Sequence, residues 1–127
     1  MRINVSSVLV DDQEKALRFY TEKLGFVKKA DVPVGPDRWL TVVSPEAPDG
    51  PELLLEPLGF PPARTYQKAL FEAGIPATSF AVDDVHREHA RLARLGVSFR
   101  TEPTPAGPVT IATLDDTCGN LIALVQS

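Results

Sequence analysis

His86 and His89 are the residues of this chain whose types and spacing most resemble a pair of metal ligands. They stand three residues apart with Glu88 between them, and in a helix this spacing places two imidazoles on neighbouring turns. A transition-metal site needs a further donor at suitable spacing, and the sequence shows none. We therefore expect His89 to edge a helix–sheet interface and His86 to face solvent.

Cys118 is the only cysteine, so it forms no internal disulfide and belongs to no thiolate cluster. Asp115 and Asp116 precede it closely, and their negative charge disfavours the thiolate form that acts as a nucleophile. We expect the two carboxylates to shape the turn before the last strand rather than to serve as an acid–base pair.

An internal repeat defines the elements that must position these residues. Placing Ile3 on Ile75, a shift of 72, pairs the segment INVSSVLVDD with IPATSFAVDD. After a one-residue gap in the helical stretch that follows, Leu24-Gly25-Phe26 falls on Leu95-Gly96-Val97. At a shift of 69, GPELLLEP lies over GNLIALVQ. The two halves share one plan.

Each half reads as one strand, one helix and three strands. Asp12 and Asp84 are suited to cap the helices, and Gly25 and Gly96 to end them. The strand-like runs after the helices are residues 28–34, 38–44 and 52–56, then 98–101, 108–114 and 120–126. The pattern predicts an α+β protein with two tandem βαβββ modules.

The modules are expected to cover residues 1–57 and 75–127, joined by a linker over 58–74. In the linker, Phe60-Pro61-Pro62 predicts a stiff turn and residues 63–73 a short helix. A module of about 60 residues has a marginal core. We therefore expect the whole chain, 1–127, to form one domain.

Several short motifs resemble those of the vicinal oxygen chelate superfamily, which contains glyoxalase I, extradiol dioxygenases and bleomycin resistance proteins. The motifs are VDD, ALRFY and LGF in the first half, at residues 10–12, 16–20 and 24–26, and FAVDD and DTCGN in the second, at 80–84 and 116–120. The resemblance covers essentially the whole chain. It implies a cup-shaped mixed and antiparallel sheet with the helices outside.

The resemblance also implies where metal ligands would stand. In metal-dependent members, His on each opening strand and Glu or another donor on each closing strand bind the metal. Those positions fall on Val5 and Ala77, and on Leu54 and Ala123, with Leu53 replacing Leu54 if the alignment slips by one. Hydrocarbon side chains offer no lone pair to a metal. We therefore expect a metal-free member without a cofactor.

Strand alternation predicts which side chains line the concave side of the cup. Apolar pairs assign one face of each strand to the core: Leu40 and Val42, Leu53 and Leu55, Val109 and Ile111, Ile122 and Leu124. The pocket residues are then expected to be Val5, Ser7, Leu9, Trp39, Thr41, Glu52, Leu54, Glu56, Ala77, Ser79, Thr110 and Ala123, with Val43 and Ala112 on the same face. A largely apolar face with a few polar groups is typical of a small-molecule site.

Composition narrows the class of partner. Thirteen Lys and Arg stand against seventeen Asp and Glu, a net charge of −4, which argues against nucleic acid and anionic membranes. No apolar run is long enough to span a bilayer and no secretory signal is visible. We expect a cytoplasmic protein, a homodimer by resemblance, with a small organic ligand.

Three functions are compatible with these residues. The first is a glyoxalase or bleomycin-resistance-like binding protein that sequesters an organic compound or antibiotic without a metal. The second is a lyase, isomerase, glyoxalase-like or dioxygenase-like enzyme of the same fold, with Glu52 or Glu56 as base and Ser7, Ser79 or Thr110 bonded to a carbonyl oxygen. The third is an interaction module with a filled cup. Bound metal favours the enzyme, and an apolar ligand without metal favours the binder.

Overall fold

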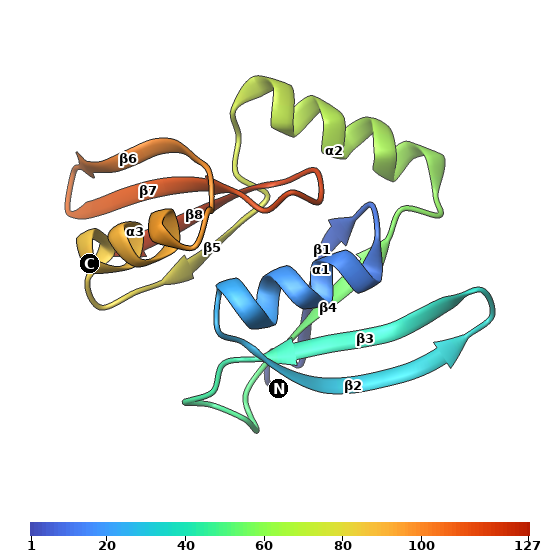
Figure 1. Cartoon of the computed structure of the whole chain (residues 1–127). Coiled ribbons are helices and arrows are strands. Elements are labelled where there is room, and N and C mark those ends of the chain that lie inside the picture. The colour runs from blue at the N-terminus through green and yellow to red at the C-terminus, as the bar shows by residue number, and fades with distance from the viewer. The chain divides into compact units, whose positions relative to one another are not determined.

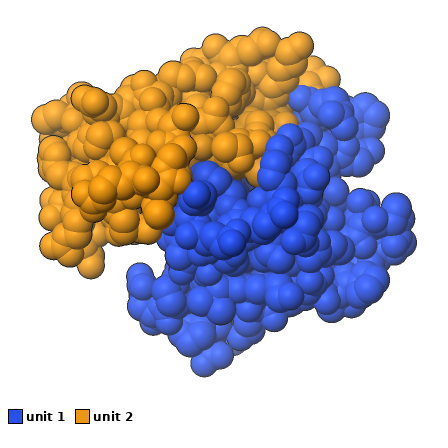
Figure 2. Space-filling model, viewed as in Figure 1, with its two compact units in different colours: residues 1–64 blue, residues 65–127 orange.

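The computed structural model describes residues 1–127 (Figure 1). The chain divides into two compact units, residues 1–64 and 65–127 (Figure 2). None of the helices combines the length and the hydropathy of a membrane-spanning segment.

The first unit is a four-stranded mixed sheet with one helix. Its elements are β1 (Val5–Val10), α1 (Gln13–Arg18), a short π-helix η1 (Phe19–Lys23), β2 (Val27–Val34), β3 (Asp37–Val43) and β4 (Glu52–Pro57). The strand order is β1-β4-β3-β2, with β1 parallel to β4 and the other pairs antiparallel.

The second unit repeats this topology after an additional helix. Its elements are α2 (Pro61–Ala73), which begins at the end of the first unit, then β5 (Thr78–Ala81), α3 (Val85–Arg94), β6 (Phe99–Ala106), β7 (Val109–Asp115) and β8 (Leu121–Gln126). The order is β5-β8-β7-β6, with β5 parallel to β8. The predicted α+β fold of two βαβββ modules is confirmed.

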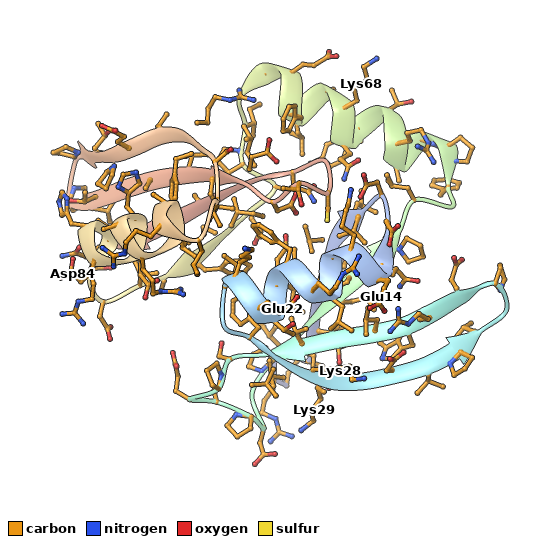
Figure 3. The ribbon with its side chains drawn as sticks, in the orientation of Figure 1. Glu14, Glu22, Lys28, Lys29, Lys68 and Asp84 are labelled. Atoms are coloured by element: carbon orange, nitrogen blue, oxygen red, sulfur yellow. The ribbon has the colours of Figure 1, made fainter.

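Aspartate caps begin the equivalent helices. The Asp12 carboxylate accepts the Lys15 N–H at 3.0 Å, and Asp84, at the start of α3 (Figure 3), accepts the Arg87 N–H at 3.0 Å. Each bond satisfies an amide of the first turn that has no partner within the helix. Gly25 and Gly96 follow the helices with φ of 89° and 88°, the left-handed conformation that ends a helix at low cost.

The one-residue gap between the two copies has a structural explanation. The first helical stretch contains one residue more than the second, and the additional residue widens the helix into η1. There the Leu24 N–H donates to the Phe19 carbonyl at 3.2 Å, an i to i−5 bond. Both helical stretches can therefore end at an equivalent glycine.

Two predicted boundaries differ from the structure. Helix α2 starts at Pro61, so the two prolines form its first turn rather than a preceding stiff turn, because that turn needs no N–H donors. Strand β6 continues to Ala106 through Pro103 and Pro105. It lies at the edge of its sheet, where a strand tolerates residues that donate no hydrogen bond.

Candidate functional site

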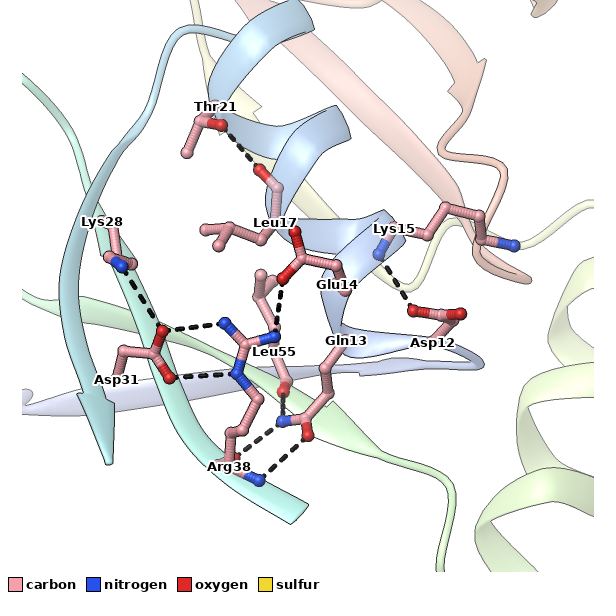
Figure 4. Close-up of polar contacts among 10 residues, drawn as sticks. All are labelled: Asp12, Gln13, Glu14, Lys15, Leu17, Thr21, Lys28, Asp31, Arg38 and Leu55. Atoms are coloured by element: carbon pink, nitrogen blue, oxygen red, sulfur yellow. Dashed lines mark hydrogen bonds and ion pairs between the residues drawn. The ribbon is translucent and has the colours of Figure 1, made fainter. Parts of the chain in front are cut away.

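The first sheet has one face toward α1 and one away from it. Arg38 on β3 lies on the α1 face, because its Nη1 donates to Glu14 of α1 at 2.9 Å (Figure 4). Leu40 and Val42 share that side of the strand and are fully buried. The alternate residues of β3 point the other way, onto what we call the averted face of this sheet.

The register of β1, β3 and β4 defines the averted face. Val5 lies opposite Glu52, and Leu54 lies opposite both Ser7 and Thr41. Registered residues project on the same side of a sheet. The face therefore gathers the predicted pocket residues of the first half: Val5, Ser7, Leu9, Trp39, Thr41, Glu52, Leu54 and Glu56, together with Val43.

The same register shows on which face each of the two candidates for the first-half ligand position lies. Leu53 lies opposite Val42 and so belongs to the α1 face, whereas Leu54 shares the averted face with Val5. Of the two, Leu54 is therefore the residue of β4 that lies on the same face as Val5.

Trp39 is the largest exposed side chain on this face. The indole residue is 43% exposed and Val5 is 38% exposed, while Leu54 is buried. Val32 on the neighbouring strand β2 lies directly opposite Trp39 and is 53% exposed. Sequence patterns did not identify Val32, because strand β2 is exposed along nearly its whole length and lacks alternation.

The second sheet has one face toward α3 and one away from it. The prediction that Thr110 lies on the pocket face is wrong. The side chain of Gln126 accepts the N–H of Val85 at the start of α3 at 2.9 Å, so Gln126 faces α3. Thr110 lies opposite Gln126 and Ala112 opposite Leu124. Both therefore lie on the α3 face. Val109 and Ile111, which were expected in the core, lie on the opposite face, which we call the averted face of the second sheet.

The sequence of strand β7 explains why the predicted face of Thr110 is wrong. The strand reads V-T-I-A-T-L, so apolar residues occupy both of its faces. Alternation taken from Val109 and Ile111 gives one parity, whereas alternation taken from Leu114 gives the other. Only pairing with β8 decides, and it places Ile111 and Thr113 beside Val125 and Ala123. Ser79 of β5 lies opposite Ala123 of β8. Ala77 precedes β5 and donates its N–H to the Leu121 carbonyl at 2.8 Å.

A hydrogen-bonded pair stands out on the averted face of the first sheet. The Thr41 hydroxyl donates to Glu52 Oε1 at 2.6 Å and accepts the Ala30 N–H at 3.1 Å. Thr41 is fully buried. The irregular register of β2 between Lys28 and Ala30 turns this amide toward the hydroxyl, a detail that no sequence pattern indicates.

Arg38 anchors the opposite, α1 side of the same strand. Its guanidinium donates to both carboxylate oxygens of Asp31 at 3.0 and 2.8 Å as well as to Glu14 (Figure 4). The bond from Arg38 holds the pKa of Asp31 down to about 2. Gln13 adds bonds to the carbonyls of Arg38 and Leu55 at 2.7 and 2.9 Å. Arg38 thus stabilises the framework behind the candidate site and does not line it.

The remaining reactive residues have structural roles. His89 packs edge-on against Phe99 with ring centroids 4.5 Å apart, and His86 is exposed, as predicted. Asp115 and Asp116 accept turn amides: Thr117 N–H at 2.7 Å, and Cys118 N–H at 2.8 Å. The predicted turn-forming role of both carboxylates is confirmed.

A buried polar network connects α2 to this turn. Gln67 Nε2 donates to the Cys118 carbonyl at 3.1 Å and to Asn120 Oδ1 at 3.2 Å, and Asn120 Nδ2 donates to Asp116 at 2.8 Å. A Cβ on Gly119 would lie 2.7 Å from the Gln67 amide, and its φ is +101°. Only glycine permits this close approach.

The structure brings no three His, Cys, Asp or Glu side chains together as a metal site. Val5, Leu54, Ala77 and Ala123, where the resemblance places the family's ligands, carry no side-chain donor atoms, so these residues do not fit a bound metal. A shallow depression of about 580 Å³ lies elsewhere in the first unit. Its lining is Arg2, Ile3, Asn4, Asp49, Gly50 and Pro51, none of which belongs to the averted face.

A sequence model of the Glyoxalase/Bleomycin resistance protein/Dioxygenase superfamily matches residues 2–124. The chain belongs to this superfamily. Its members share the paired βαβββ topology described above, while their chemistry differs with the residues that each presents.

Three similar proteins cover nearly the whole chain. YurT of Bacillus subtilis (strain 168), whose name describes it as uncharacterised, is 60% identical over 99% of both chains. The crystal structure of UcmS2 superposes with a TM-score of 0.85 at 31% identity, covering 100% of this chain and 98% of UcmS2. TnmS3, an antibiotic binding protein from Streptomyces sp. CB03234, gives a TM-score of 0.78 at 32% identity, covering 99% of this chain and 95% of TnmS3.

Proposed function

We propose that this protein binds a small organic molecule, such as an antibiotic, through the averted face of its first sheet and sequesters it without a metal. The observation that carries the proposal is Trp39, an exposed indole on a sheet face that is mostly apolar. An aromatic ring of this kind provides a large contact area for an organic ligand. The antibiotic-binding TnmS3, 32% identical to this chain, supports the same class of ligand.

Trp39 also provides the test, because it is the only tryptophan. We expect a compound from a panel of polycyclic aromatic antibiotics to quench or shift its emission, and Trp39→Ala to weaken binding by about 1–3 kcal/mol. Leu54→Ala should weaken binding as well. Leu53→Ala, on the opposite face, should chiefly lower stability. A verified ligand that leaves the emission unchanged and binds Trp39→Ala equally well would contradict the proposal.

The metal-free state is tested separately by elemental analysis of the purified protein. We expect no stoichiometric zinc, iron, manganese or nickel, because Val5, Leu54, Ala77 and Ala123 offer no donors. One equivalent of a chelator-resistant metal, or chemical conversion of the bound compound, would favour the enzymatic alternative. We also propose that the binding form is a homodimer.

A further inference from the structure

The Thr41–Glu52 pair allows the proposed function to be narrowed to a class of ligand. A threonine hydroxyl has one proton to donate and an oxygen that accepts. Because the oxygen of Thr41 already receives the Ala30 N–H, its proton is directed to Glu52 Oε1. The carboxylate is held from one side by a fully buried hydroxyl.

The other oxygen of the carboxylate, Oε2, has no hydrogen-bond or ion-pair partner, and no lysine or arginine pairs with Glu52. Glu52 is only partly exposed. Its neighbours on the averted face are Val5 and Leu54. A carboxylate oxygen without a partner beside apolar side chains can accept a hydrogen bond from a ligand, and a charged donor forms the stronger bond.

Glu56 lies on the same strand and face but lacks this arrangement. Its side chain has no fixed partner, so it is free to change rotamer. A carboxylate that is already oriented loses less conformational entropy when a ligand binds than a mobile one. Of the two glutamates, Glu52 is therefore the better anchor.

We propose that Glu52 Oε2 anchors a protonated nitrogen of the ligand while the apolar body of the ligand lies on the averted face beside Trp39. Thr41 is a positioning residue that acts through Glu52. This inference rests on the proposed function and adds to it a class of ligand, an amine or amidine cation carried on an apolar or aromatic body.

Two probes of matched shape test the inference: 9-aminoacridine, which is protonated near neutral pH, and acridine, which is neutral there. Binding is measured by calorimetry and by Trp39 emission. The wild-type protein should bind the cation at least tenfold more tightly. Glu52→Gln should abolish this preference with little effect on acridine, because the amide keeps the shape and loses the charge. Glu46→Gln, in an exposed loop, should keep it.

Variants at Thr41 distinguish positioning from packing. Thr41→Val should lose part of the preference for the cation, and Thr41→Ser should restore it, since serine retains the hydroxyl. Thermal denaturation of each variant shows that it is folded. A preference that survives Glu52→Gln, or that is lost in Glu56→Gln instead, would overturn the role of Glu52 while leaving the proposed binding function intact. Failure of both probes to bind or to perturb Trp39 would overturn the proposed binding face and the inference with it.

Discussion

Arg38 illustrates how one residue joins three elements of the first unit. It binds Asp31 on β2 and Glu14 on α1 from its own place on β3. These bonds raise the pKa of Arg38, the one from Asp31 contributing most. The opposite effect on Asp31 makes the stability of the unit depend on pH.

We predict that Asp31→Asn makes the free energy of unfolding depend less on pH in the acid range. The pKa of Asp31 falls from 3.8 to about 2 on folding, so its contribution to stability is complete above the higher value and disappears as the pH falls through the lower one. The variant should be less stable than wild type near neutral pH, and the difference should disappear as the pH falls through about 2.

Urea unfolding at a series of pH values measures this difference. Glu22→Gln, which alters an exposed carboxylate on η1 (Figure 3), should give a curve parallel to wild type. If the curves for Asp31→Asn and wild type are also parallel from neutral to acid pH, the Arg38–Asp31 bond does not form in solution.

Thr117 is strained in the turn that precedes β8. It is the only non-glycine residue with positive φ, at 63°, a region that disfavours β-branched side chains. Thr117→Asn keeps the N–H that Asp115 accepts and tolerates the conformation. We expect it to raise the free energy of unfolding by about 1 kcal/mol, measured by thermal denaturation. Thr101→Asn, on exposed β6, should give no gain, and a loss at Thr117 would contradict the assigned strain.

At the scale of elements, the stability of each helix depends on its capping residue and on its packing against the rest of the unit. Asp84 accepts the Arg87 N–H, whereas Asp83 beside it is exposed and caps nothing. We expect Asp84→Ala to lower the free energy of unfolding by about 1 kcal/mol, measured by urea denaturation. Asp83→Ala is the matched control and should cost much less. Equal losses would mean that the cap contributes little.

Helix α2 has an unusual docking surface, because its only buried residue is a glutamine, Gln67. A helix normally docks through an apolar stripe, and a detached helix of this length is marginal in water. We predict that Gln67→Met, which keeps the side-chain length but removes both donated bonds, increases hydrogen exchange in residues 61–73 at least tenfold.

The control for this experiment lies one residue further along the same helix. The side chain of Lys68 is 77% exposed and projects from α2 (Figure 3), so Lys68→Met introduces the same residue away from the network. It should leave hydrogen exchange in α2 nearly unchanged. Neither variant should alter hydrogen exchange in β7 and β8. Unaltered exchange of α2 in Gln67→Met would show that the helix is held by other contacts.

At the scale of the whole molecule, we expect a homodimer. Each sheet ends in two edge strands, and β2 exposes Val27, Val32 and Val34 at 49%, 53% and 58%. Exposed apolar edges favour association. Light scattering over a dilution series should give about twice the 13.8 kDa mass of the chain. A 13.8 kDa particle at micromolar concentration would contradict the expectation.

The local features of this protein were readable from its sequence. The repeat, the Asp12 and Asp84 caps and the glycine stops depend on residues close together in the chain, whose conformational preferences act over a few positions. The parity of β3 was readable too, because Leu40 and Val42 alternate regularly with polar or aromatic neighbours. These patterns predicted the βαβββ modules and the averted face of the first sheet.

Long-range pairing decided the rest. Strand β7 carries apolar residues on both faces, so the position of Thr110 was set by its register with Gln126 on β8. The link from Ala30 through Thr41 to Glu52 depends on an irregular register between β2 and β3, and the Gln67 network joins residues more than fifty positions apart. Hydrogen bonds between distant strands and helices exist only after the chain has folded, and no periodicity in the sequence encodes them.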